Sequence, residues 1–151
     1  MSKRLAKELQ NLAKSPSPAC ESLGPMSDGN LFEWEAVLRG PEKTPYAGGK
    51  WKVKISIPQT YPNKPPKMWF KTPICHPNIS FPDGEVCIDV LKSQWTPAWG
   101  IAPAILAVQA MLSDPEPDSP LNIDAANLVR SGERKGYEQL IGYYMHKYKA
   151  S

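Results

Sequence analysis

The sequence predicts one domain of the α+β class. After one N-terminal helix, residues 32–71 carry the alternating apolar and polar residues of strands, whereas residues 101–148 carry the apolar spacing of helices. Strands grouped in one part of a chain and helices in another favour an antiparallel sheet with helices packed beside it. The 151 residues, 41% of them hydrophobic, are enough to enclose a substantial core, so we expect residues 1–151 to form a single domain.

The first helix is indicated by three leucines at helical spacing: Leu5, Leu9 and Leu12. Ser15 and Pro16 end it, because a proline inside a helix removes a hydrogen bond and clashes with the preceding turn. Residues 32–39 and 50–57 alternate apolar with polar side chains, which is typical of half-buried strands, and residues 67–71 form a shorter third strand. Short connections between these runs predict an antiparallel meander.

Residues 72–100 show no sustained apolar period. A loop of this length in a compact domain is usually functional, and this one contains Cys87. Helical spacing resumes in three later segments: 101–112, 123–130 and 137–148. Asn122 precedes the second of these segments and can cap it, because its side-chain oxygen accepts from backbone N–H groups that the first helical turn leaves unpaired.

The net charge of +3 is too small to indicate nucleic-acid binding. Basic residues gather in the first predicted helix, where four of them stand against one acidic residue: Lys3, Arg4, Lys7 and Lys14 against Glu8. This basic helix face is either a site for an acidic partner or an ordinary solvated surface, and the sequence leaves both readings open.

The cysteines form no C-x-x-C pair and no metal-ligand spacing, which indicates a reducing compartment with no disulfide, bound metal or cofactor. The first residues lead into no apolar signal core. The longest uncharged apolar stretch, residues 98–108, is interrupted by Gly100 and Pro103 and is too short to span a bilayer. We therefore expect a cytosolic chain without direct membrane insertion, which reaches a membrane only through a partner.

Cys87 follows Gly84 and precedes a Trp-x-Pro corner at residues 95–97, a context that suits a presented nucleophile and a buried core cysteine equally well. A protease of the papain type would pair it with His76, which lies in the same loop. A redox thiol would need Cys75 as its resolving partner. A zinc site lacks an accepted ligand spacing.

The fourth alternative is a thiol that carries an acyl group. A thioester is already activated, so its transfer needs an oxyanion donor and a site shielded from water more than a general base. Asn78 offers an amide donor in the same loop, although an asparagine after proline is also a common turn residue. Asp89, Asp118 and Ser119 are candidates to orient or desolvate an incoming nucleophile.

Seven segments, in order along the chain, resemble the ubiquitin-conjugating enzyme family. They are GP at 40–41, PYAGG at 45–49, YPNKPPK at 61–67, HPNI at 76–79, GEVCIDVL at 84–91, QWTPA at 94–98 and DSPLN at 118–122. The resemblance runs from residue 3 to residue 148. It implies the ubiquitin-conjugating (UBC) fold, a four-stranded antiparallel meander sheet flanked by four helices. It also implies an enzyme that carries the C-terminal glycine of ubiquitin on Cys87 as a thioester.

The resemblance implies further site residues and partners. Asn78 takes the oxyanion-binding or loop-bracing role of the family, two options that the sequence does not separate. Lys3, Arg4 and Lys7 match the helix face used by the ubiquitin-activating enzyme and by ligases. Two loops contact ligases in the family, and their positions here are Pro62, Asn63, Thr96, Pro97 and Ala98.

The C-terminal third resembles the peroxisomal branch of the family, with Trp99 and the turn at residues 130–132 as its most specific features. This branch implies a cysteine of a peroxisomal import receptor as acceptor, a RING ligase complex, and a peroxisomal membrane tether that holds the enzyme on the cytosolic face of that membrane. One alternative is a general cytosolic conjugating enzyme for ubiquitin or a ubiquitin-like modifier that acts on lysines. Another is an inactive scaffold with the same fold.

Three positions depart from the family pattern. Ser119 stands where many relatives carry an acidic residue, and we hypothesise that it suits transfer to cysteine, because a thiolate forms more readily than a neutral lysine amine. Asn63 stands where many relatives present an apolar anchor to ligases, which favours a dedicated ligase or a tether-assisted encounter. Phe81 and Pro82 lie in a stretch that is one residue longer than in common relatives, so the sequence leaves open in which direction the Asn78 side chain points.

Overall fold

The computed structural model of the chain describes residues 3–115 and 122–149. The strands are β1 (Cys20–Ser27), β2 (Asn30–Arg39), β3 (Lys50–Ser56) and β4 (Lys67–Phe70). The helices are α1 (Lys3–Lys14), α2 (Ile101–Ser113), α3 (Ile123–Arg130) and α4 (Arg134–Lys147), with a short 3-10 helix, η1 (Asp89–Leu91), before α2. The strand order is β1-β2-β3-β4 and each neighbouring pair is antiparallel, so the expected α+β class and four-stranded meander are confirmed.

Strands β2 and β3 form the centre of the core. Three residues of β2 pair with three of β3 across the ladder: Trp34 with Ile55, Ala36 with Val53, and Leu38 with Trp51. All of them are buried, with at most 1% of their surface exposed. Because successive side chains of a strand point to opposite faces, this register puts the whole set on the face that packs against the helices.

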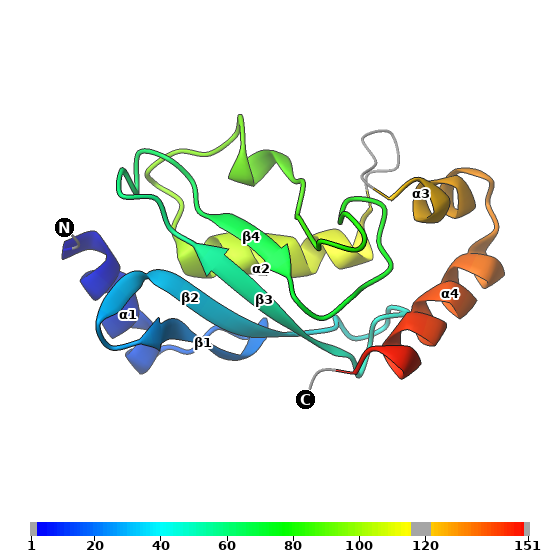
Figure 1. Cartoon of the computed structure of the whole chain (residues 1–151), viewed down its shortest axis with the longest axis horizontal. Coiled ribbons are helices and arrows are strands. Elements are labelled where there is room, and N and C mark those ends of the chain that lie inside the picture. Colours follow the sequence, from blue (N-terminus) through cyan, green and yellow to red (C-terminus); the bar gives the residue numbers. More distant parts are fainter. Residues whose placement is uncertain (1–2, 116–121, 150–151) are drawn as a thin grey trace.

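The helices surround the sheet unevenly. Figure 1 shows α2 running behind the sheet, α1 at one end of the molecule, and α3 and α4 at the other. The buried residues of α2 are Ile101, Ala104, Ile105, Val108, Met111 and Leu112. A helix that is apolar on most of its surface is a core helix, and α2 accordingly lies closest to the middle of the fold.

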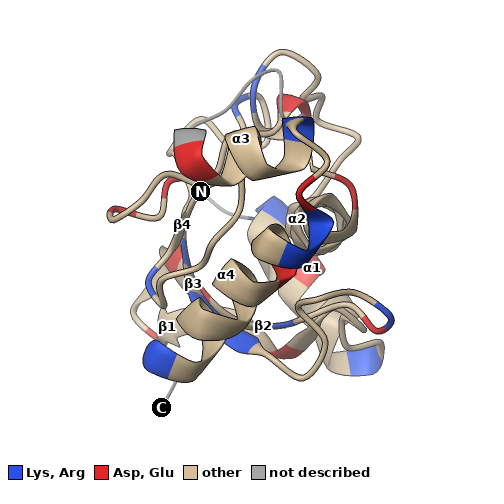
Figure 2. Ribbon diagram, turned by 90° about the vertical axis from the view of Figure 1, so that its right-hand side faces the viewer, with Lys and Arg blue, Asp and Glu red and all other residues tan. Residues whose placement is uncertain are grey.

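Along the ribbon in Figure 2, the positions of Lys and Arg are interspersed with those of Asp and Glu. Among the described residues, no helix combines the length and the apolarity that crossing a membrane requires.

Strand β1 is the strand that the residue pattern alone missed. Residues 23–25 are half-buried in succession, so burial along β1 does not alternate. Its pairing with β2 shifts between Cys20 and Ser22 and again between Pro25 and Ser27. Such irregularities bend a strand and remove its period-two signal, which is why only the family resemblance supplied this strand.

Residues 72–100 contain more secondary structure than the lack of an apolar period in their sequence indicates. Isolated antiparallel bridges join Ile79 to Val86 and Trp69 to Glu85, and η1 follows at Asp89–Leu91. The expectation of a loop without secondary structure is therefore wrong around Cys87. Bridges of a single residue pair are too short to produce a repeating pattern in the sequence.

Candidate active site

Cys87 lies directly after the bridge between Ile79 and Val86. Its backbone N–H donates to the carbonyl oxygen of Asn78 over 3.0 Å, which holds the two residues side by side. The Cys87 side chain is half-buried, whereas Asn78 is only 1% exposed. Both residues line one groove of about 370 Å³. The thiol is therefore open to solvent and has a buried asparagine as its neighbour.

The groove also contains a third predicted residue. Asp89 is exposed, lines the groove and opens η1. Ala107 and Met111 line the groove from α2. Asp118 and Ser119, the other two predicted catalytic residues, lie outside the described residues. The structure thus brings together Asn78, Cys87 and Asp89.

Gly84 fixes the turn that leads into Cys87. Its N–H donates to the Ser80 carbonyl oxygen over 2.9 Å, and its own carbonyl oxygen accepts the Phe70 N–H of β4 over 2.7 Å. The φ angle of Gly84 is +81°, in the left-handed region that glycine tolerates. A Cβ atom at this position would lie 1.9 Å from the Phe70 carbonyl oxygen. Only glycine allows the turn to approach β4 this closely.

Phe81 lies in the same turn and contacts α4. Its ring centroid is 5.3 Å from that of Tyr144 and 6.4 Å from that of Tyr148. The peptide bond between Phe81 and Pro82 is cis. Phe81 therefore connects the segment before Cys87 to α4 through ring contacts.

His76 is fully buried and does not act as a base for Cys87. Its Nδ1 accepts the backbone N–H of Asn78 over 3.0 Å. Nε2 must then carry the proton, and it donates to the Met111 carbonyl oxygen over 2.8 Å. Burial lowers the pKa of His76 to about 4. Both ring nitrogens are engaged by the backbone, so the pairing of His76 with Cys87 as in a protease is wrong. The imidazole instead positions the backbone of Asn78.

The neutral, buried state of His76 predicts a pH-dependent stability. Its pKa is about 4 in the folded chain, whereas an unfolded histidine has a pKa of about 6.5, so the unfolded chain binds more protons between these values. The contribution of His76 is therefore complete above about pH 6.5 and is lost as the pH falls toward 4. The loss reaches up to about 3 kcal/mol and is measured by urea unfolding across this range.

A matched pair of variants separates His76 from the carboxylates, which also titrate in acid. We expect His76→Gln to flatten the dependence of the unfolding free energy between about pH 6.5 and 4.5. His146→Gln alters an exposed histidine on α4 and should leave the slope of the native chain intact. An unchanged slope in His76→Gln would contradict the assignment.

The other two thiols are buried and free. Cys20 is 5% exposed and Cys75 is 1% exposed, and neither forms a disulfide. Burial raises the pKa of Cys20 to about 11 and that of Cys75 to about 12. Almost no thiolate forms at neutral pH under these conditions, so a redox pair of Cys75 with Cys87 has no reactive resolving thiol. Within residues 3–115 and 122–149, no three His, Cys, Asp or Glu side chains gather where they could hold a metal ion.

The two loops that the family resemblance marks as ligase contacts lie next to each other. The indole Nε1 of Trp95 donates to the Pro62 carbonyl oxygen over 2.8 Å, and the rings of Tyr61 and Trp95 lie 5.9 Å apart. The predicted contact residues at these loops are half-buried Pro62 and the exposed residues Asn63, Thr96, Pro97 and Ala98. Trp95 therefore joins the two loops into one surface.

Arg4 is turned toward the second loop rather than toward solvent. Its Nη1 and Nη2 donate to the carbonyl oxygens of Pro97 and Trp99, each over 2.8 Å. Lys3 and Lys7, predicted on the same helix face, are exposed. The three basic residues thus divide into one that braces the loop and two that remain available for a partner.

Glu8 is a site-supporting residue that sequence reasoning missed. Its carboxylate accepts from the Arg4 Nε over 3.0 Å and from the Tyr61 hydroxyl over 2.6 Å. It also accepts the Ile101 N–H over 2.7 Å at the start of α2, where Gly100 offers no side-chain cap. One carboxylate thus caps α2 and connects it to α1 and to the first loop. The only signal in the sequence was the four-residue spacing of Arg4 and Glu8.

Arg4 should matter more for stability than its basic neighbours do. We expect Arg4→Ala to lower the free energy of unfolding by about 1–2 kcal/mol, because two carbonyl oxygens and the Glu8 carboxylate lose a charged donor. The matched variant Lys7→Ala removes an exposed charge and should change it by less than about 0.5 kcal/mol. Urea unfolding of both variants measures the difference, and equal effects would show that Arg4 does not brace the loop.

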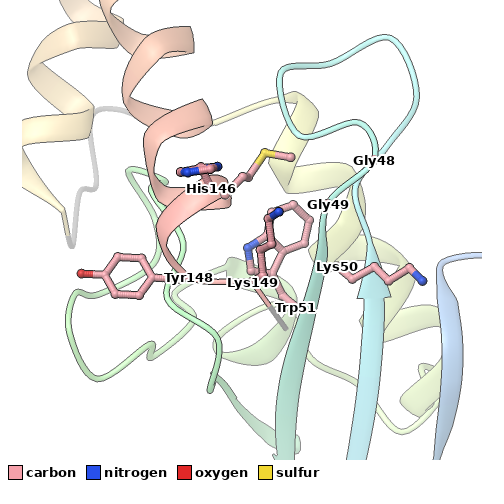
Figure 3. A pocket seen from close by; sticks show the side chains of 8 residues that line it. Gly48, Gly49, Lys50, Trp51, His146, Tyr148 and Lys149 are labelled. Atoms are coloured by element: carbon pink, nitrogen blue, oxygen red, sulfur yellow. The ribbon is translucent and has the colours of Figure 1, made fainter. Parts of the chain in front are cut away.

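A second hollow lies between the end of α4 and the start of β3 (Figure 3). The labelled residues are Gly48, Gly49, Lys50 and Trp51 on one side of the hollow and His146, Tyr148 and Lys149 on the other. It shares no lining residue with the groove at Cys87 and contains none of the predicted site residues.

Comparison with known proteins gives a consistent result. A family model described as "Ubiquitin-conjugating enzyme" matches residues 4–145. The protein "Ubiquitin-conjugating enzyme E2 PEX4" of Gibberella zeae is 49% identical over 143 residues, which cover 93% of this chain and 83% of the relative. "Protein PEROXIN-4" of Arabidopsis thaliana is 45% identical over 117 residues, 78% of this chain and 74% of the relative. The crystal structure of H. polymorpha ubiquitin conjugating enzyme Pex4p, in complex with the soluble domain of Pex22p, matches with a TM-score of 0.90 and 38% identity over 99% of this chain and 98% of that chain.

The meander sheet, the four helices that the structure describes and the family match together define the class of protein: the chain belongs to the ubiquitin-conjugating enzyme family. Its similarity to the two peroxin-4 relatives and to Pex4p extends over most of the chain. It is therefore a ubiquitin-conjugating enzyme of the peroxin-4 type, and the predicted enzyme class and peroxisomal branch are confirmed.

Proposed function

We propose that Cys87 accepts ubiquitin from the activating enzyme as a thioester and passes it to an acceptor. The Cys87 thiolate attacks the carbonyl carbon of the thioester on the activating enzyme. A new C–S bond to Cys87 forms, the old C–S bond breaks, and the cysteine of the activating enzyme leaves as a thiolate. The acceptor repeats this attack on the Cys87 thioester, and Cys87 then leaves as a thiolate. The observation that carries the proposal is the pairing of half-buried Cys87 with buried Asn78 in one groove.

Asn78 would either stabilise the oxygen of the thioester carbonyl or brace the loop that contains Asn78 itself. Negative charge develops on that oxygen during each attack, and an uncharged amide donor in a partly shielded groove stabilises it without any movement of the protein. His76 supports this role, because its Nδ1 accepts the Asn78 N–H and fixes the backbone from which the amide projects. The backbone engages both ring nitrogens of His76, so this histidine does not act as a base for Cys87, which fits a reaction that begins from an activated thioester.

The acceptor that we propose is a cysteine of a peroxisomal import receptor. The similarity to peroxin-4 proteins supports it. Ser119 would favour a thiol acceptor, because a thiol needs less help than an ammonium group in losing its proton. Enzyme loaded with ubiquitin and then mixed with free cysteine or free lysine tests this directly. We expect faster discharge to cysteine, and a Ser119→Asp variant should raise the lysine rate relative to the cysteine rate. An unchanged ratio would overturn the role of Ser119.

The proposed partners are a RING ligase complex and a peroxisomal membrane tether, which would hold the enzyme on the cytosolic face of that membrane. The Pex4p neighbour supports the tether, because its crystal structure is a complex with the soluble domain of Pex22p. The joined loops at Pro62 and Trp95 support the ligase, because they form a continuous surface beside α1. Titration of this chain with the soluble domain of a Pex22p protein should give a one-to-one complex in gel filtration. Co-elution that fails at micromolar concentrations would argue against a tether of this kind.

A further inference from the structure

Tyr46 is a buried tyrosine to which the mechanism above assigns no role. It belongs to the PYAGG segment at residues 45–49, and 0% of its surface is exposed. Its hydroxyl donates to the backbone carbonyl oxygen of Cys75. The same hydroxyl oxygen lies 3.0 Å from that of Tyr137 on α4. Because a tyrosine hydroxyl has a single proton, Tyr46 gives its proton to Cys75 and accepts the proton of Tyr137.

The surroundings of Tyr46 hold its hydroxyl in place. The Tyr46 N–H donates to the Thr44 hydroxyl over 3.2 Å, and the Gly49 N–H donates to the Tyr46 carbonyl oxygen over 3.0 Å. The Tyr46 ring lies beside the His76 imidazole, with ring centroids 6.0 Å apart. Burial raises the pKa of Tyr46 well above its usual range and that of Tyr137 to about 12, so both hydroxyls keep their protons at neutral pH. The two hydroxyls therefore form a fixed, neutral chain of donors.

The Cys75 carbonyl is the first of three fixed backbone points that lead to Asn78. The second is His76, whose Nδ1 accepts the Asn78 N–H over 3.0 Å. The third is the Pro77 carbonyl oxygen, which accepts over 3.0 Å from the N–H of Asn122, the residue that caps α3. These points lie on consecutive residues, so a shift at the first displaces the peptide groups that follow it and changes the direction of the Asn78 side chain.

We propose that Tyr46 is a positioning residue, which sets the direction of the Asn78 amide through the Cys75 carbonyl, and that Tyr137 fixes the Tyr46 hydroxyl for this purpose. The inference rests on the proposed thioester and on the action of Asn78 at its carbonyl oxygen. Tyr46 acts through the backbone rather than on a reacting atom. An amide that already points to the place where negative charge develops stabilises that charge without reorganisation.

The test loads the full chain with ubiquitin, removes ATP and measures discharge to free lysine without a ligase. We expect Tyr46→Phe to reach the native loaded fraction but to discharge about tenfold more slowly, because a small misplacement of a catalytic group is costly. Tyr137→Phe should discharge about threefold more slowly, since it removes only the outer donor. Two matched variants should discharge at the native rate. Tyr143→Phe removes an exposed hydroxyl from α4, and Ile55→Val shortens a buried side chain of β3.

Two further readouts distinguish positioning from a general loss of stability. Asn78→Ala should itself slow the discharge, and the addition of Tyr46→Phe to that variant should slow it no further, because both changes act on the same amide. In amide NMR spectra, Tyr46→Phe should shift the backbone and side-chain signals of Asn78. Ile55→Val should leave these signals in place.

The outcomes separate this inference from the proposed function. Native discharge in Tyr46→Phe or in Asn78→Ala, or losses that multiply in the double variant, would overturn the role of Tyr46 and leave the thioester intact. Equal slowing of Ile55→Val would assign the effect to stability and overturn it as well. If Tyr46→Phe does not fold, Tyr137→Phe carries the same measurements. A native chain that forms no reductant-sensitive adduct would overturn both proposals together.

Discussion

Replacing Cys87 with alanine is expected to abolish ubiquitin loading, with a loss of at least about 10³-fold against the native chain. The substitution removes the only thiol among the described residues that line the groove with Asn78 and Asp89. Cys20 and Cys75 offer no substitute, because burial raises their pKa values to about 11 and about 12. Loading with activating enzyme, ATP and ubiquitin, followed by electrophoresis without reductant, measures the effect. Because Cys87 is only half-buried, we expect Cys87→Ala to fold like the native chain, so that unfolding does not explain the loss of loading. Circular dichroism of the variant checks that it is folded.

Two further variants sharpen this result. Cys87→Ser should collect ubiquitin slowly as an oxyester, which survives a thiol reductant but is cleaved by alkali, because a serine hydroxyl forms a C–O bond in place of the C–S bond. Cys75→Ala removes a thiol from the core and should retain loading in whatever fraction remains folded. Normal loading of Cys87→Ala would overturn the assignment of the nucleophile.

Gly84→Ala is expected to lower the free energy of unfolding by about 3 kcal/mol or more, a fall of about 10 °C in the melting temperature. Two costs combine at this position. The φ angle of +81° is unfavourable for alanine, and the new Cβ would lie 1.9 Å from the Phe70 carbonyl oxygen. A backbone atom cannot move aside as a flexible side chain can, so the turn before Cys87 must separate from β4. Thermal unfolding measures the loss.

Gly132→Ala is the matched control for Gly84→Ala. Gly132 also has a positive φ, +74°, but a Cβ placed there meets nothing within 4 Å. This variant should therefore show only the conformational cost of a positive φ, about 1 kcal/mol. If the two variants lost equal stability, the close approach of Gly84 to Phe70 would contribute nothing.

Strands β2 and β3 could be predicted from the sequence because one face of each is buried. Residues 50–55 alternate between exposed or half-buried lysines and buried apolar side chains, and this alternation appears directly in the sequence. Strand β1 could not be predicted in this way, because its two register shifts and Pro25 break the alternation. The bridge between Ile79 and Val86 is a single pair, which leaves no period to detect.

The site was harder to predict than the strands, because it is built from contacts between residues that lie far apart in the sequence. The hydrogen bond from the Cys87 N–H to the Asn78 carbonyl oxygen closes a nine-residue separation that no local pattern encodes. The sequence placed Asn78 in the same loop as Cys87, but it did not predict this backbone contact. The sequence identified Arg4 as a basic residue of the first helix. Its role in bracing a loop depends on a hydrogen bond to the Pro97 carbonyl oxygen, 93 positions away, which the sequence does not predict. His76 had the right chemistry for a base, and its complete burial excludes that role.

A single thioester on Cys87 is the central claim, and mass spectrometry of the loaded enzyme at short reaction times tests it most directly. The expected result is a mass increase of one ubiquitin that a thiol reductant removes, with the linkage located at Cys87 by peptide mapping. Ubiquitin located on Cys20 or Cys75, or a complete absence of any reductant-sensitive adduct on native enzyme, would contradict it.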